Sequence, residues 1–250
     1  VSTTTIQQPE LDEIDVLSLP ALLFRKGEDV DLDGLTDTEE EYFATDSGTG
    51  DSDKDGYFDS QEIVNLYNPK GVAPQRLIDS GLVKEYLHPQ SQYRVYVPIG
   101  WEVAPVDPDG NHVIFSAISG EYIEIYRSKK QENESLSDWF ARSLDGSRFA
   151  QFASFTNRFT VEGSKRQDGL VAFYESVSDV YVLAYQPAES AMVVYPSIVE
   201  MMMQSFRPSE NRSVLPTQPL LPSVTTTISS QNNVTVSSTS AVTGTVLFAL

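Results

Sequence analysis

The chain contains no cysteine and only two histidines among its 250 residues. The lack of cysteine excludes disulfides, thiolate metal sites and cysteine nucleophiles, and two histidines leave little for imidazole ligation. Basic residues are also scarce, with 17 Lys and Arg against 36 Asp and Glu, a net charge of −19. Because nucleic-acid binding requires a basic surface, we expect no nucleic-acid partner.

Long hydrophobic runs are missing as well. No stretch reaches 18 apolar residues, so the residues given predict no contact with a membrane. The first residue is Val rather than Met, which is typical of a processed chain or a fragment. An anchor or leader removed from this chain therefore remains an open alternative.

The negative charge is concentrated near the start of the chain. Residues 1–62 hold 18 acidic and 3 basic side chains, whereas residues 63–250 hold 18 and 14. Fourteen carboxylates lie between Glu28 and Glu62, with Lys54 as their single basic neighbour. Packing so many like charges costs folding free energy unless a cation neutralises them. We therefore expect a cationic partner for this segment.

Two twelve-residue windows in this segment match the EF-hand calcium loop, D-x-[DN]-x-[DN]-G-x5-E. Each window has carboxylates at loop positions 1, 3, 5, 9 and 12, glycine at position 6, and a backbone carbonyl at position 7. The expected ligands are Asp29, Asp31, Asp33, Leu35 (carbonyl), Asp37 and Glu40 in the first loop, and Asp51, Asp53, Asp55, Tyr57 (carbonyl), Asp59 and Glu62 in the second.

The spacing suits a hard divalent cation. Calcium takes six to eight oxygen ligands, and alternate Asp residues on a tightly curled loop direct oxygens to one centre. Gly34 and Gly56 allow the sharp turn, and Glu40 and Glu62 can return from a following helix to chelate with both oxygens. The alternative is a solvated acidic linker, which needs neither the glycine nor the terminal glutamate. We therefore predict two calcium ions, with Asp37 and Asp59 bound directly or through water.

The two loops start 22 residues apart, which leaves no room for a helix entering the second loop. One short helix is expected over 37–44 and another over 59–67. This pattern, with the pair Thr45-Asp46 between the loops and Y-N-P-x-G at 67–71, resembles thrombospondin type 3-like calcium repeats. That family usually has Pro where this chain has Ser47. Dockerins rank second, because they lack Glu at position 12 and have longer apolar helices.

From residue 91 onward the sequence predicts an α+β domain with a mainly antiparallel sheet. Hairpin turns are expected at Asp168-Gly169 and Ser178-Asp179. The expected strands are 93–97, 113–118, 122–126, 158–163, 170–176 and 180–185, and the expected helices are 135–144 and one from about Pro196 to before Pro208. A short helix is also expected within 75–86.

This second region resembles the PsbP-like α/β sandwich family more weakly. The resemblance is carried by P-x-G-W at 98–101, S-L-x-D-W at 135–139 and M-x-x-S-F at 202–206. It implies a fold and no particular activity. The organisation expected is an N-terminal linker (1–27, with a docking segment at 16–24), paired calcium repeats (28–71), a connector (72–90), the PsbP-like domain (91–208) and a Ser/Thr/Pro-rich tail (209–250).

Together these features predict a non-enzymatic, calcium-binding protein of the extracellular space or cell surface. Calcium would rigidify the acidic module and fix the angle between the segment that precedes this module and the sandwich. The sandwich is expected to stay folded when calcium is removed. One alternative is a subunit of a surface assembly that pairs with a protein partner or another copy through a terminal strand, such as 224–236. Another is a sandwich domain that binds a ligand or catalyses a reaction in a polar pocket with converging carboxylates.

Overall fold

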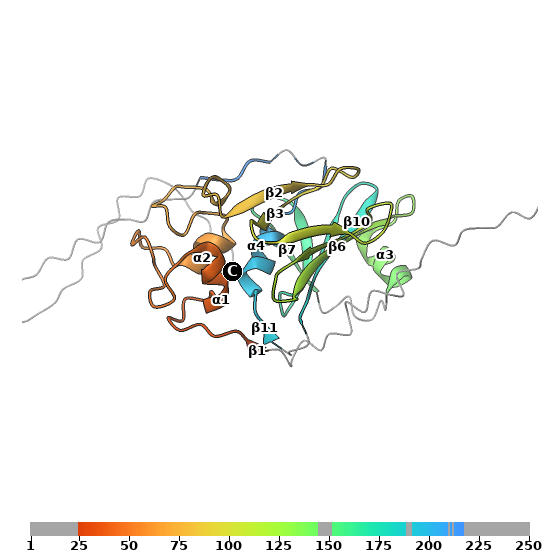
Figure 1. Cartoon of the computed structure of the whole chain (residues 1–250). Helices are drawn as coiled ribbons and strands as arrows, with labels where there is room; N and C mark the ends of the chain where they lie inside the picture. The colour runs from red at the N-terminus through yellow and green to blue at the C-terminus, as the bar shows by residue number, and fades with distance from the viewer. Residues whose placement is uncertain (1–24, 145–151, 189–191, 210, 212, 218–250) are drawn as a thin grey trace, which may run out of the picture.

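The computed structural model describes residues 25–144, 152–188, 192–209, 211 and 213–217. The expected docking segment at 16–24 and the expected tail strand at 224–236 lie outside these residues. Figure 1 shows the acidic segment with α1 and α2 at one end of the molecule and the sheet at the other. None of the helices in the described part of the chain has the length and apolar character needed to cross a bilayer.

A seven-stranded antiparallel sheet forms the centre of the structure, in the order β4-β5-β6-β10-β9-β8-β7. Its strands are β4 (Glu102–Pro105), β5 (His112–Ser116), β6 (Tyr122–Lys129), β7 (Phe152–Thr156), β8 (Glu162–Arg166), β9 (Val171–Glu175) and β10 (Asp179–Gln186). A separate hairpin pairs β2 (Val83–Leu87) with β3 (Arg94–Pro98), and β1 (Arg25–Lys26) runs parallel to β11 (Met192–Val193). The expected mainly antiparallel sheet is confirmed.

Two hydrophobic cores cover the two faces of this sheet, as alternation along β10 shows. Tyr181, Leu183 and Tyr185 enter the larger core with α4 (Pro196–Ser205) and the β2–β3 hairpin, whereas Val180 and Val182 enter the smaller core beneath α3 (Leu136–Ser143). Successive side chains of a strand point to opposite faces, so one strand serves both cores. The fold is therefore an α/β sandwich with helices on both sides of the sheet (Figure 1).

The helices begin where their capping residues predict. Thr36 and Glu39 form a capping box at the start of α1 (Asp37–Phe43), and Ser135 caps α3 by accepting the backbone N–H of Asp138. Pro196 occupies the first turn of α4, where its missing N–H costs nothing. The helix expected over 59–67 is shorter in the structure: α2 spans Asp59–Val64, and Asn65 is its C-cap residue.

Two expected elements are wrong. The segment 75–86 is not one helix: a 3-10 turn (Leu77–Asp79) is followed by Gly81 at φ +79° and then by strand β2, which pairs with β3. The strand expected over 158–163 is mostly a turn between β7 and β8. There the Asn157 carboxamide oxygen accepts the N–H groups of Phe159 and Val161, which holds the backbone in a loop.

The acidic segment shares the larger core with the sandwich. Leu35, Phe43, Ile63 and Leu66 are fully buried there beside residues of β3, β10 and α4. Helix α4 contacts both α2 and β3, and Figure 1 shows it between the acidic segment and the sheet. The apolar side chains of residues 28–71 therefore pack against the sandwich rather than among themselves alone.

Candidate metal centre

The two acidic loops fold with the same internal hydrogen bonds. In each loop the carboxylate at position 1 accepts the N–H of the glycine at position 6, at 3.1 Å for Asp29 and 3.0 Å for Asp51. The carboxylates at positions 3 and 5 each accept the N–H two residues further on, at 2.7–3.2 Å in both loops. Both glycines have positive φ, +110° at Gly34 and +98° at Gly56, so a side chain there would be strained. The repeated sequence therefore gives a repeated loop conformation.

These bonds hold the aspartates of each loop in one cluster. Carboxylate oxygens of Asp29, Asp31 and Asp33 lie within 4.8 Å of one another, and so do those of Asp51, Asp53 and Asp55. In each of these aspartates, at least one carboxylate oxygen accepts a backbone N–H group. Asp29 Oδ1, Asp31 Oδ2 and Asp53 Oδ2 are buried without a hydrogen-bond donor. Buried acceptors of this kind carry a desolvation penalty that a cation would remove.

Glu40, at position 12 of the first loop, is the most informative residue of the site. It lies in α1, is 2% exposed, and its Oε2 has no hydrogen-bond partner. Burial, together with the negative charges of Asp31, Asp33 and Asp37, raises its pKa to about 7. Among the described residues, no ion pair involves Glu40 or the three clustered aspartates of its loop. A buried carboxylate beside three others in this way fits a cation-binding arrangement.

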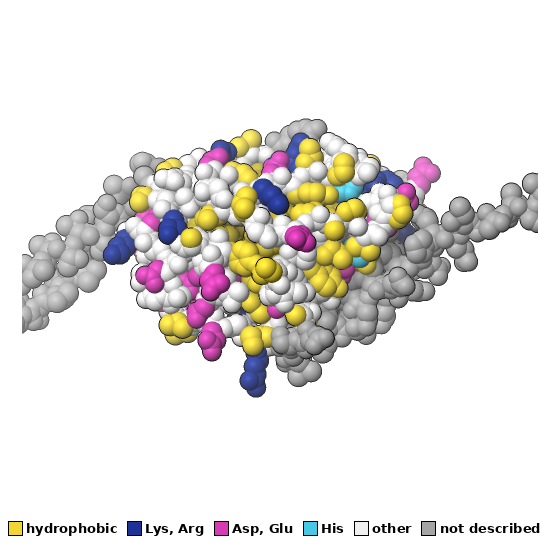
Figure 2. Space-filling view, in the orientation of Figure 1, with side chains coloured by type: hydrophobic (Ala, Val, Ile, Leu, Met, Phe, Trp, Pro, Cys, Tyr) yellow, Lys and Arg dark blue, Asp and Glu magenta, His cyan; other side chains and the backbone are white. Residues whose placement is uncertain are grey.

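The equivalent residue of the second loop, Glu62, lies in α2 and is 1% exposed. Burial raises the pKa of Asp53 and of Asp59 above their usual values, and neighbouring aspartates add to both shifts. The second loop thus concentrates negative charge in the same way as the first. Figure 2 shows acidic side chains gathered at this end of the molecule.

The position-9 aspartates turn back toward the start of their own loops. Asp37 Oδ1 accepts the N–H of Val30 at 3.0 Å. Asp59 Oδ1 accepts the N–H of Ser52 at 3.0 Å, and its Oδ2 accepts the hydroxyl of Ser52 at 2.7 Å. Both side chains therefore brace the loop, and like Glu40 and Glu62 they lie outside the two close aspartate clusters. Of the two expected alternatives, this geometry favours contact with an ion through water.

The position-7 residues, whose carbonyls are the expected ligands, follow the clusters directly. Leu35 buries its side chain in the larger core, and its N–H donates to Asp33. The N–H of Tyr57 donates to Asp55 in the same way. Burial raises the pKa of the Tyr57 hydroxyl, and the nearby charges of Asp55 and Glu62 contribute.

The first loop is fastened to α4 by a residue that sequence reasoning missed. Glu39 is fully buried, and its Oε1 accepts the N–H of Ile198 at 2.8 Å while its Oε2 accepts that of Thr36 at 3.1 Å. Thr36 also donates its hydroxyl to the carbonyl of Val194 at 2.7 Å, and Ser197 donates to the carbonyl of Gly34 at 3.3 Å. The T-x-x-E pattern of a capping box was the available sequence signal, but it does not identify the partner helix.

The two loops also contact each other through Ser60 and Gly50. Ser60 donates its N–H to Asp33 Oδ2 at 2.9 Å and its hydroxyl to the Asp33 carbonyl at 2.6 Å. Gly50 packs so closely on Asp33 that a Cβ at position 50 would lie 2.6 Å from the Asp33 Cβ. The N–H of Asp59 donates to the carbonyl of Gly50 at 2.9 Å. The loops therefore form one unit without the entering helix that an ordinary EF-hand has.

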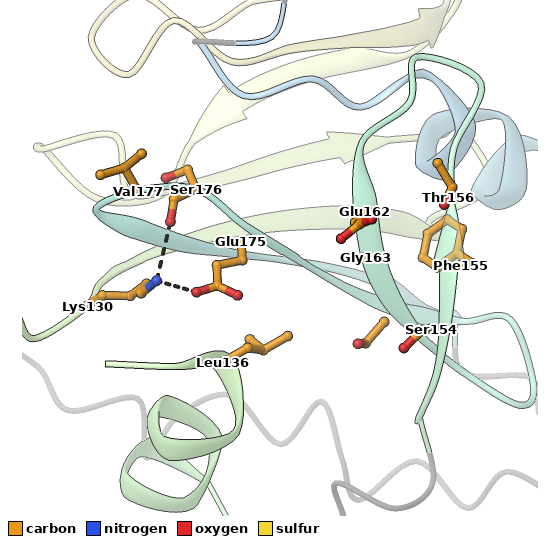
Figure 3. A pocket seen from close by; sticks show the side chains of 11 residues that line it. Lys130, Leu136, Ser154, Phe155, Thr156, Glu162, Gly163, Glu175, Ser176 and Val177 are labelled. Atoms are coloured by element: carbon orange, nitrogen blue, oxygen red, sulfur yellow. Dashed lines mark hydrogen bonds and ion pairs between the residues drawn. The ribbon is translucent and has the colours of Figure 1, made fainter. Parts of the chain in front are cut away.

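A groove of about 740 Å³ lies on the α3 side of the sheet (Figure 3). It is open and polar, and Lys130 forms an ion pair with Glu175 at one end. Its polar lining is Lys130, Ser154, Thr156, Glu162, Ser164, Glu175 and Ser176. Lys130 therefore neutralises one of the two carboxylates that line the groove.

His112 lies in strand β5 of the sheet and is partly buried. Its Nε2 lies 2.9 Å from Glu124 Oε2, and its ring stacks on Tyr126 at 3.8 Å between centroids. Gln186 donates to the other oxygen of Glu124 at 2.6 Å. These contacts occupy both carboxylate oxygens of Glu124.

Comparison with known proteins gives no family. No protein-family model and no curated protein matches the chain. Among solved structures, a protein from Bacteroides thetaiotaomicron matches at 7% identity and a TM-score of 0.35, over 51% of this chain and 48% of that one. Cyanobacterial PsbP (CyanoP) from Synechocystis sp. PCC 6803 matches at 13% identity and a TM-score of 0.36, over 51% of this chain and 93% of that one.

The chain thus spans about half the length of the first of these proteins. Both structural likenesses are too distant to support an argument about fold or function. Neither of these two structures is described as containing thrombospondin type 3-like repeats, and that resemblance continues to depend on the loop motifs alone.

Proposed function

We propose that the two acidic loops bind two calcium ions and that these ions stabilise the junction between the acidic segment and the sandwich. The observation that carries the proposal is Glu40: a buried carboxylate with an unpartnered oxygen beside the aspartate cluster of its own loop. Asp29 Oδ1 and Asp31 Oδ2 add two more buried oxygens without donors. Oxygen-only ligands at this loop spacing are typical of calcium sites.

The proposed role is structural, because the loops connect directly to the larger core. An ion bound by Glu40 would fix the first turn of α1, and the adjacent Glu39 binds the first turn of α4. Leu35 follows the cluster and is fully buried in the same core. Calcium at the first loop would therefore stabilise the packing of α1 on α4.

Affinity in the range of roughly 10⁻⁵–10⁻³ M is expected for sites of this type. Such sites are filled where calcium is millimolar, so we propose an extracellular or cell-surface location. Magnesium requires a near-octahedral arrangement at shorter distances, which a loop closed by a bidentate glutamate does not offer. The protein would thus discriminate calcium from magnesium.

Isothermal titration calorimetry of the metal-free protein tests this proposal. We expect two calcium ions per chain and a much weaker signal with magnesium. Glu40→Gln should weaken the first site at least ten-fold, because it removes a charged, buried ligand worth about 1.5–3 kcal/mol. Glu41→Gln, which changes an exposed neighbour in the same helix, is the matched control and should leave both sites intact. Absence of binding heat at 10 mM calcium would refute the proposal.

A further inference from the structure

Ser60 joins the second loop to the first. Its N–H and hydroxyl both donate to Asp33, at 2.9 and 2.6 Å, across 27 residues of sequence. Ser60 lies in the first turn of α2, two residues before Glu62, which closes the second loop. Asp33 occupies position 5 of the first loop and belongs to its close aspartate cluster. A residue on the helix of one site therefore orients a ligand of the other.

We propose that the two sites bind calcium with positive cooperativity, and that Ser60 is the positioning residue that couples them. This inference rests on the proposed calcium-binding function. An ion held by Glu62 fixes the first turn of α2 relative to the second loop. Ser60 then holds the Asp33 carboxylate and carbonyl in place, so the first site needs less ordering when its own ion arrives.

The bonds that Asp33 makes explain why its orientation depends on α2. Its Oδ1 accepts the N–H of Leu35 within the loop at 2.7 Å, and its Oδ2 accepts the N–H of Ser60. The loop bond fixes one oxygen, and the bond from α2 fixes the rotation of the carboxylate about it. Loss of order in α2 would release that rotation while leaving the rest of the first loop unchanged.

Simple electrostatics predicts the opposite sign of coupling. A second loop without its ion is more negative than one that holds the ion. Its charge would then attract calcium more strongly to the first loop. The direction of the effect therefore distinguishes coupling through Ser60 from coupling through charge alone.

The glycine amides at position 6 allow each site to be followed separately. The N–H groups of Gly34 and Gly56 donate to Asp29 and Asp51, so their ¹⁵N–¹H signals report the first and second loops. We expect Glu62→Gln, which disables the second site, to raise the calcium midpoint of the Gly34 signal about five-fold, equivalent to one hydrogen bond. In the Ser60→Ala background the same change should raise it only about two-fold, because the backbone N–H bond remains.

Gln61→Ala is the matched control, since Gln61 is the next residue of α2 and is exposed. In that background Glu62→Gln should retain its full effect on Gly34. Asp53→Asn provides a second way to disable the second loop should Glu62→Gln fail to fold, and it should raise the Gly34 midpoint similarly.

The possible results separate the two proposals. If neither glycine signal moves in the wild-type protein at 10 mM calcium, the calcium-binding function itself is refuted. If both move but the Gly34 midpoint is unchanged or lower in Glu62→Gln, the sites bind calcium without positive coupling and only this inference fails. An equal effect of Glu62→Gln with and without the Ser60 hydroxyl would overturn the assignment to Ser60.

Discussion

Removal of calcium should destabilise the whole molecule, including the face of the sheet farthest from the loops. The reason is the larger core, in which Leu35, Phe43 and Ile63 of the acidic segment pack with the sandwich. This expectation replaces the one drawn from the charge distribution, which predicted that the sandwich would remain folded without calcium. Without calcium, repulsion among the carboxylates of the loops would destabilise the core that the acidic segment and the sandwich share.

The size of the effect follows from ligand linkage. With a dissociation constant of about 10⁻⁴ M and 10 mM calcium, each site stabilises the folded state by about 2.7 kcal/mol. Two sites therefore contribute about 5 kcal/mol, a large share of the stability of a typical domain. For a chain of this length that corresponds to a shift in melting temperature of about 10–20 °C.

The two tryptophans provide the assay. Trp101 lies in the larger core and makes an edge contact with Tyr42 of α1, whereas Trp139 belongs to α3 and lies in the smaller core. In a Trp101→Phe variant, fluorescence reports only the unfolding around Trp139. We expect calcium to raise the melting temperature measured by Trp139 fluorescence by the same amount as the melting temperature measured by circular dichroism. The shared-core reasoning would be refuted if the melting temperature around Trp139 did not depend on calcium while removal of calcium made residues 28–70 protease-sensitive.

Three further predictions address single residues. In calcium titrations, Glu62→Gln should weaken the second site far more than Asp59→Asn, because both oxygens of Asp59 already accept hydrogen bonds from Ser52. Equal weakening would contradict the assignment of Glu62 as a direct ligand and of Asp59 as a ligand through water. Glu39→Gln should lower the free energy of unfolding, measured by urea titration, by about 1–3 kcal/mol, because it alters a buried acceptor of two backbone N–H groups. An unchanged free energy of unfolding would show that the contact between Glu39 and α4 is dispensable. Burial lowers the pKa of His88, so its folded pKa lies below the unfolded value of about 6.5. The stability that His88 contributes is therefore complete above pH 6.5 and is lost as the pH falls below that value. In saturating calcium, urea titrations at pH 7.5 and 5.5 should show a smaller loss of stability at the lower pH in His88→Gln than in the wild-type protein.

Much of the fold could be predicted because it depends on local signals. The Ser135 cap and the hydrophobic spacing after it predicted α3, and the apolar run 180–185 after the turn at Ser178-Asp179 predicted β10. The prediction of a helix within 75–86 was wrong because the apolar residues of this segment also fit helical spacing. Pairing with β3 makes its last part the strand β2. Pairing of that kind is a long-range contact that propensity does not encode.

The clustering of the aspartates within each loop was predictable from the sequence, whereas the connections of the loops to the rest of the chain were not. The loop motif specifies glycine and carboxylate positions within twelve residues, and the structure brings the aspartates of each loop together. The bond from Ile198 to Glu39 spans 159 residues, and that from Ser60 to Asp33 spans 27. Neither donor is recognisable from a pattern, because a backbone N–H is offered by almost every residue.

The close approach of Gly50 to Asp33 has a consequence for how this pair of loops can vary in sequence. Any Cβ at position 50 would force the two loops apart, since the Asp33 Cβ cannot rotate away. Deletions or insertions between residues 41 and 50 would move the glycine from that contact. The interval between the loops should therefore tolerate substitution at its exposed positions while its length and its final glycine stay fixed. That combination gives a narrower pattern for finding proteins built in this way than the two loop motifs alone.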